Sequence, residues 1–173
     1  MKFKVGDKVI YPYHGIAQLM AREPRTMNGE EFTMLVFDVP HRARNEHRAM
    51  TVTVPEHRAE DVGIRAAVSL EDAEEVLATL AVTDARVPTN WSRRFKNHQL
   101  KLKSGDLFEC AEVVRNLSVR QRSTNLAAAE AAMYEAARYL VSSELALTWN
   151  VTTEEAEARM DAAMQVPAPA ETP

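Results

Sequence analysis

The residues that this sequence has few of exclude several kinds of protein. Cys110 is the only cysteine among 173 residues, so neither an intramolecular disulfide nor a cysteine-based zinc site can form. The five glycines stand apart from one another, which excludes a glycine-rich phosphate loop. No run approaches the roughly 18 consecutive apolar residues of a membrane span, and the first residues lack the apolar core of a signal peptide. We therefore expect a cytoplasmic protein without a membrane segment.

Motifs of catalysis are also absent. The sequence contains no Gly-x-Ser-x-Gly and no His-Glu-x-x-His. Three histidines, His41, His47 and His57, lie near one another in the chain, but arginines surround them and their spacing matches no common ligand pattern. We predict that the protein is not an enzyme and that it holds neither a cofactor nor a metal ion.

Positive charge is concentrated in one part of an acidic chain. The net charge is −4, yet residues 88–122 carry eight Lys/Arg against three Asp/Glu, while residues 1–87 and 123–173 are both net negative. A local concentration of positive charge can bind phosphate even on an acidic protein. The alternative is a solvated helix face, which is what most charge runs are.

The first sixty residues have the pattern of β-strands. Asn28-Gly29 is the strongest hairpin signal, because both residues accept the positive φ of a tight turn, and it joins 21–27 to 30–38. Residues 49–54 alternate between apolar and polar side chains. The segment Pro40–Arg48 is polar without a period, so we expect an exposed hairpin loop there. Short strands at this spacing predict a small Tudor-like or SH3-like barrel.

Helical periodicity replaces the strand pattern after Pro55. Ser69 opens a capping box, and an apolar face follows it: Leu70, Ala73, Val76, Leu77 and Leu80. Further helices are expected from Asn90 or Ser92 to about Leu102, over 107–117 with Cys110 on the apolar face, over 126–147, and from Thr152 to about Met164. We predict an α+β two-domain protein, with a β module at 1–62, an all-α helical domain at 63–165 and a disordered tail at 166–173.

The start of the basic region combines an aromatic residue with positive charge. Trp91 falls in the first turn of a predicted helix, and Arg93, Arg94 and Lys96 follow it. Helix N-termini and basic side chains attract phosphates, and an aromatic side chain beside them can wedge between bases. The alternative is that Trp91 and Phe95, which are four residues apart, form the core face of this helix. Solvent exposure of the Trp91 indole distinguishes the two.

Several stretches of the chain resemble the CarD family of bacterial RNA polymerase-binding transcription regulators. They are Phe3–Gly15, Asn90–Lys96, Ser104–Arg115 and Ser143–Leu147, in that order over residues 1–147. The resemblance implies a Tudor-like N-terminal domain that binds the RNA polymerase β subunit. It also implies a helical domain that binds promoter DNA in the minor groove at the upstream edge of the bubble. The family's wedge residue would be Trp91, with Arg93, Arg94 and Lys96 on phosphates.

The resemblance also assigns residues to the polymerase contact. Arg25 and Met27, just before the Asn28-Gly29 turn, match polymerase-contacting positions. The sequence departs from relatives at Thr53, where a contacting arginine is frequent. We expect a monomeric regulator that stabilises the open promoter complex; the alternative is a protein that docks on polymerase or another partner without touching DNA.

Overall fold

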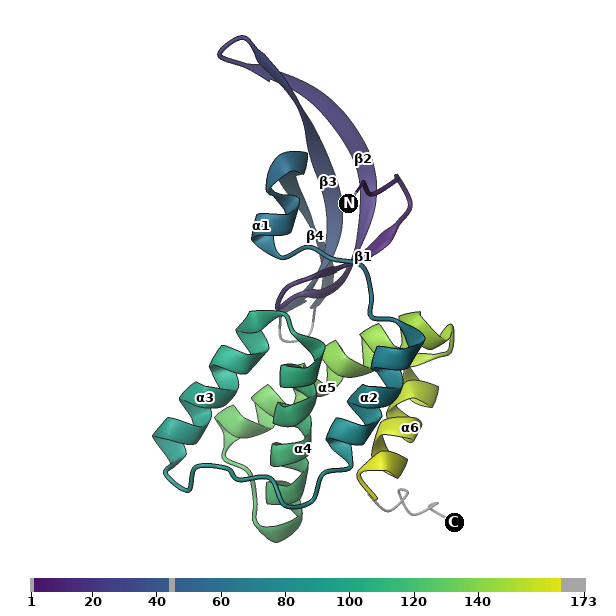
Figure 1. Cartoon of the computed structure of the whole chain (residues 1–173). Helices are drawn as coiled ribbons and strands as arrows, with labels where there is room; N and C mark the ends of the chain where they lie inside the picture. Colours follow the sequence, from purple (N-terminus) through teal and green to yellow (C-terminus); the bar gives the residue numbers. More distant parts are fainter. Residues whose placement is uncertain (1, 44–45, 166–173) are drawn as a thin grey trace. The chain divides into compact units, whose positions relative to one another are not determined.

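The computed structural model describes residues 2–43 and 46–165, which form two compact units. The first unit, Met1–Ala67, contains a four-stranded antiparallel sheet with the strand order β1-β2-β3-β4, curved into a half-barrel. The second unit begins at Val68 and is helical (Figure 1). The predicted α+β class, a Tudor-like β domain followed by a helical domain, is confirmed.

Hairpins connect the strands of the sheet. The strands are β1 (Lys8–Tyr11), β2 (Gly15–Met27), β3 (Glu30–Ala43) and β4 (Glu46–Pro55). Asn28 and Gly29 join β2 to β3 with φ values of 54° and 83°, as the predicted hairpin turn requires. A β-bulge between Leu19 and Ala21 shifts the register of β2 against β3, and bulges of this kind increase the bend of a sheet.

The predicted exposed loop at Pro40–Arg48 is wrong. Strands β3 and β4 continue through most of this segment and pair His41 with Arg48 and Ala43 with Glu46; residues 44–45 lie outside the described part of the chain. Backbone hydrogen bonds hold a two-stranded ribbon together whatever its side chains are. An apolar period is therefore absent from the sequence although the strands are present.

The core of the first unit lies on one face of the sheet. Alternate residues of β3, Leu35, Phe37 and Val39, are fully buried, as the period of two in a strand requires. The 3₁₀ helix η1 (Glu56–Arg58) and helix α1 (Ala59–Val62) follow β4. Ala59 and Ile64 complete the same apolar cluster.

Five helices form the described part of the second unit. They are α2 (Leu70–Leu80), α3 (Trp91–Ser104), α4 (Leu107–Ser123), α5 (Ala128–Trp149) and α6 (Thr153–Ala163). Ser69 caps α2 by accepting from the Asp72 amide at 3.0 Å, and Thr152 and Glu155 form a reciprocal capping box on α6. Both caps agree with the sequence patterns.

Helices α4 and α5 contribute most of the core of the second unit. Its fully buried apolar side chains include Val113, Val114, Leu117, Val141 and Leu145, and Cys110 is buried among them as predicted. The expected inward position of Leu70 is wrong, because its side chain is 63% exposed. As the first residue of α2, it lies at the end of the helix, before the buried turns begin. Among the described residues, no helix has the length and apolarity to cross a bilayer.

Candidate nucleic-acid interface at the start of helix α3

Asn90 determines where helix α3 begins. Its backbone is extended, and its side-chain oxygen accepts a hydrogen bond from the Arg93 amide at 3.0 Å. This is the geometry of an N-cap residue, so of the two candidates in the sequence Asn90 is the cap. Trp91 is consequently the first residue of the helix.

The Trp91 indole is stacked on a neighbouring ring and remains partly open to solvent. Its ring stacks on Phe95 with 5.0 Å between centroids and an interplanar angle of 12°. Phe95 is partly buried and packs against the helical core, whereas Trp91 remains 43% exposed. Phe95 thus takes the core position that the alternative assigned to both residues. The exposed part of the indole is available to another molecule.

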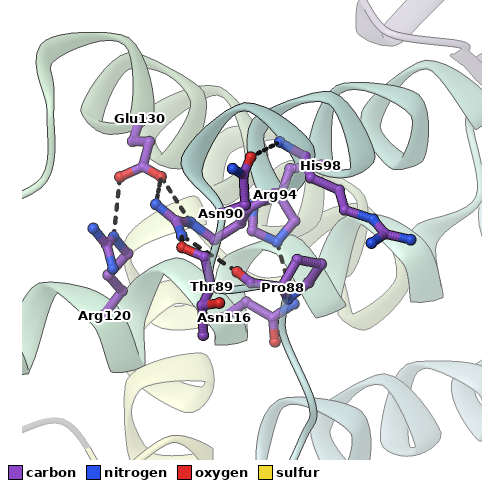
Figure 2. Close-up of polar contacts among 9 residues, drawn as sticks. Pro88, Thr89, Asn90, Arg94, His98, Asn116, Arg120 and Glu130 are labelled. Carbon is purple, nitrogen blue, oxygen red and sulfur yellow. Dashed lines mark hydrogen bonds and ion pairs between the residues drawn. The ribbon is translucent and has the colours of Figure 1, made fainter.

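Arg94 occupies a buried structural position. Its side chain is enclosed, with only 3% of the residue exposed. Its Nε and Nη2 donate to Oε1 of Glu130 at 3.0 and 2.8 Å, and its Nη1 donates to the carbonyls of Pro88 and Thr89 at 3.3 and 3.1 Å (Figure 2). The predicted phosphate contact of Arg94 does not fit this placement, because Glu130 already compensates its charge and the guanidinium is not open to a ligand.

Glu130 also binds a second arginine. Its Oε2 accepts a hydrogen bond from Nε of Arg120 at 3.2 Å (Figure 2). Glu130 is 1% exposed, while Arg120 is partly exposed. A buried carboxylate therefore lies between two guanidinium groups, one enclosed and one reaching the surface, and the cluster keeps a net positive charge.

These contacts fix the start of α3 relative to two other helices. Arg94 holds the two residues that precede Asn90 and also reaches α5 through Glu130, and Glu130 in turn holds Arg120 of α4. No local pattern in the sequence pointed to Glu130, which is 36 residues from Arg94. Arg120 could be noticed in the sequence only because it falls within the basic region, residues 88–122. The network supports the backbone that carries Trp91.

His98 lies in the same region and is uncharged at neutral pH. It is buried, and its Nε2 lies 3.3 Å from Nδ2 of Asn116 (Figure 2). Burial, followed by the charges of Lys101 and Arg94, lowers the pKa of His98 to about 4, and the charge of Glu130 opposes them. The ring accordingly contributes packing and a hydrogen bond, and no positive charge for a ligand.

Exposed positive charge remains on α3. Arg93 and Lys96, both predicted site residues, are exposed, and so is Lys103. Lys101 instead pairs with Glu112. Within the described ranges, no ion pair involves Arg93, Lys96 or Lys103. The structure thus leaves Trp91, Arg93 and Lys96 exposed near the start of α3, whereas Arg94 is buried.

The predicted polymerase contact lies in the first unit, on strand β2. Arg25 and Met27 are exposed, and Arg25 forms a surface ion pair with Glu23 at 2.8 Å. β1 pairs with β2 only over residues 15–18. Beyond the contacts of Leu19 with the N-terminal segment, no described strand covers this edge of β2. An uncovered edge of this kind can accept a strand from another protein.

Comparison with known proteins relates both units to one family. Residues 3–68 match the CarD-like/TRCF RID domain, and residues 75–161 match the CarD C-terminal domain. The chain is also similar to YdeB of Bacillus subtilis (strain 168), which is provisionally named a transcription factor. The two are 27% identical over 150 residues, which cover 87% of this chain and 94% of YdeB.

Proposed function

Because the chain belongs to the CarD family, we propose that it is a transcription regulator that binds the RNA polymerase β subunit and stabilises the open promoter complex. Membership supports a transcription-related role, and the CarD-like/TRCF RID domain is an RNA polymerase-interacting domain. In this proposal Trp91 contacts DNA in the minor groove at the upstream edge of the bubble. Arg93 and Lys96 contact phosphates beside it.

The exposed Trp91 indole is the observation that carries the proposal. When an aromatic or apolar side chain enters the minor groove, its new contacts with DNA offset the free-energy cost of unstacking the bases. An indole already stacked on Phe95 loses little conformational freedom when it binds. The Arg94–Glu130 pair holds the preceding backbone, which keeps the ring at a fixed place on the surface.

Stabilisation of the open complex follows from differential affinity. A ligand shifts an equilibrium between two states only by the difference in its affinity for them. A ring that stacks on unpaired bases binds the melted promoter better than the closed one, whereas phosphate contacts favour both. Arg93 and Lys96 would therefore add affinity, and Trp91 would determine the preference for melted DNA.

Attachment to polymerase would use the uncovered edge of β2. Backbone groups of the edge would supply affinity and the side chains of Arg25 and Met27 would supply specificity. The ion pair of Arg25 with Glu23 is exposed, and such pairs contribute only about 0–1 kcal/mol. Arg25 can therefore exchange Glu23 for an acidic group of the partner at little cost.

The lifetime of the open complex tests this function. Trp91→Ala should shorten the lifetime of open complexes formed with the protein and leave its binding to polymerase intact. Val119→Ala, which also truncates an exposed apolar side chain of the helical unit, is the matched control and should have the wild-type lifetime. Equal lifetimes for Trp91→Ala and wild type, with polymerase binding retained, would contradict the wedge and favour docking without DNA contact.

A further inference from the structure

We infer that DNA contact extends along the whole outer face of helix α3, with Lys103 as a further phosphate contact at the end opposite Trp91. We define this outer face as Arg93, Lys96, Leu100 and Lys103. The inference rests on the proposed function, because it assumes that α3 meets promoter DNA. The proposed function needs a contact at the start of the helix, which would involve Arg93 and Lys96 only. The further inference instead places the helix lengthwise along one strand of the DNA backbone.

The spacing of these residues aligns them on one side of the helix. Steps of three, four and three residues keep side chains on a single helical face, and all four members are exposed. Leu100, in the middle, is 60% exposed although it is apolar. The opposite side, with Arg94, His98 and Leu102, is buried. The outer face is therefore continuous and turned toward solvent along the helix.

The length of the outer face fits a stretch of DNA backbone. From Arg93 to Lys103 the helix rises about 15 Å, at roughly 1.5 Å per residue. This is the axial rise of about four to five nucleotides of one strand, at about 3.4 Å each. Three cations over that distance can each reach a phosphate of the same strand, and Leu100 would face the sugars between them.

The distribution of ion pairs distinguishes the two sides of α3. The helix contains no Asp or Glu. Its inward-facing cations are compensated from neighbouring helices, Arg94 by Glu130 and Lys101 by Glu112. The cations of the outer face have no ion-pair partner among the described residues. On α3 the uncompensated positive charge therefore lies on the solvent-facing side, and this charge complementarity favours nucleic acid as the occupant.

Lys103 also has a simpler explanation that the test must separate. It lies in the last turn of α3, where a cation interacts favourably with the helix dipole. In that role its removal would lower the melting temperature slightly and leave DNA binding unchanged. A phosphate contact has a different signature, because each neutralised phosphate releases counterions and adds to the salt dependence of binding.

The experiment measures the salt dependence of DNA binding by the full chain. Affinity for a forked promoter fragment is titrated over a series of potassium chloride concentrations for wild type, Lys96→Ala, Lys103→Ala and Lys103→Arg. Lys8→Ala, which removes an exposed lysine of the first unit, is the control. The slope of log affinity against log salt should shrink by about 0.9 for each alanine variant at a phosphate contact. It should be retained in Lys103→Arg and in the control.

The outcomes separate the inference from the proposed function. Loss of slope in both Lys96→Ala and Lys103→Ala supports the lengthwise contact. A smaller slope in Lys96→Ala alone overturns the lengthwise contact. It leaves the proposed function intact, with DNA contact limited to the first turn of α3. An unchanged slope in both variants overturns the inference and also contradicts the proposed phosphate contact of Lys96.

Discussion

Glu130 and Arg94 are 36 residues apart in the chain, and two hydrogen bonds of 3.0 and 2.8 Å join their buried side chains. The same arginine bonds the carbonyls of Pro88 and Thr89, immediately before the N-cap of α3. The position of the Trp91 indole therefore depends on a carboxylate in a different helix. Arg94 therefore holds the start of α3 in place, whereas Arg93 and Lys96 of the same helix remain exposed to solvent.

Removal of the Glu130 charge should weaken both the fold and the DNA contact. Glu130→Ala leaves Arg94 buried without a counter-charge, which costs about 3–5 kcal/mol when one partner of a buried pair is lost. Denaturant unfolding measures this cost. Glu135→Ala, at an exposed position of the same helix, should change stability by less than about 0.5 kcal/mol. Equal stability of the two variants would show that the pair does not hold α3.

A conservative variant separates the two effects of Glu130. In Glu130→Gln the side chain keeps its shape and its carbonyl oxygen can still accept from Arg94, but the charge is gone. We expect an intermediate loss of stability and a shortened open complex at temperatures where the variant is fully folded. A wild-type lifetime in the folded variant would mean that the network does not position Trp91.

His98 makes stability sensitive to mild acid. Its pKa in the folded protein, about 4, lies below the ordinary value of 6.5, so the unfolded chain takes up a proton that the folded protein resists. The neutral ring contributes its full stabilisation above about pH 6.5, and this is lost progressively as the pH falls toward 4. The loss amounts to at most about 3 kcal/mol. Unfolding free energies of wild type and His98→Gln over pH 4–7 should converge as the pH falls; parallel curves would contradict this assignment.

The signals that could be found in the sequence were local ones. Ser69, Asn90 and Thr152 cap helices within three residues of their own position, and Asn28-Gly29 forms a turn by itself. Capping and turn formation depend on neighbouring backbone groups, so a short segment specifies them. Most of the fold could be predicted on this basis.

The partners of the basic residues could not be predicted in the same way. All five cations of α3 look equivalent in the sequence, yet Arg94 and Lys101 have acidic partners on other helices and Arg93, Lys96 and Lys103 have none among the described residues. Pairing of this kind depends on which helices pack together. The pairing of β3 with β4 beyond Pro40 was missed for a related reason. Backbone pairing between polar segments leaves no apolar period in the sequence.

Arg25 should control attachment to polymerase. Arg25→Glu reverses the charge at the uncovered edge of β2 and places it beside Glu23, its present partner. We expect polymerase binding to weaken by about tenfold or more, which corresponds to at least about 1.4 kcal/mol, without a change in the melting temperature of the protein. Arg58→Glu makes the same charge change at another exposed position of this unit and serves as the control. Equal binding by both variants would place the polymerase contact elsewhere.

The fluorescence of Trp91 provides the most direct test of the central claim, that its indole contacts unpaired promoter DNA. The chain has two tryptophans, so Trp149 must be replaced to isolate the signal of Trp91. Its replacement by Phe removes no hydrogen bond, because the buried Nε1 of Trp149 has no partner among the described residues. In Trp149→Phe the emission comes from Trp91 alone. We predict quenching when this variant, without polymerase, binds a forked promoter fragment, and a much smaller change on the matched duplex. Emission that stays unchanged on the bound fork would contradict the account.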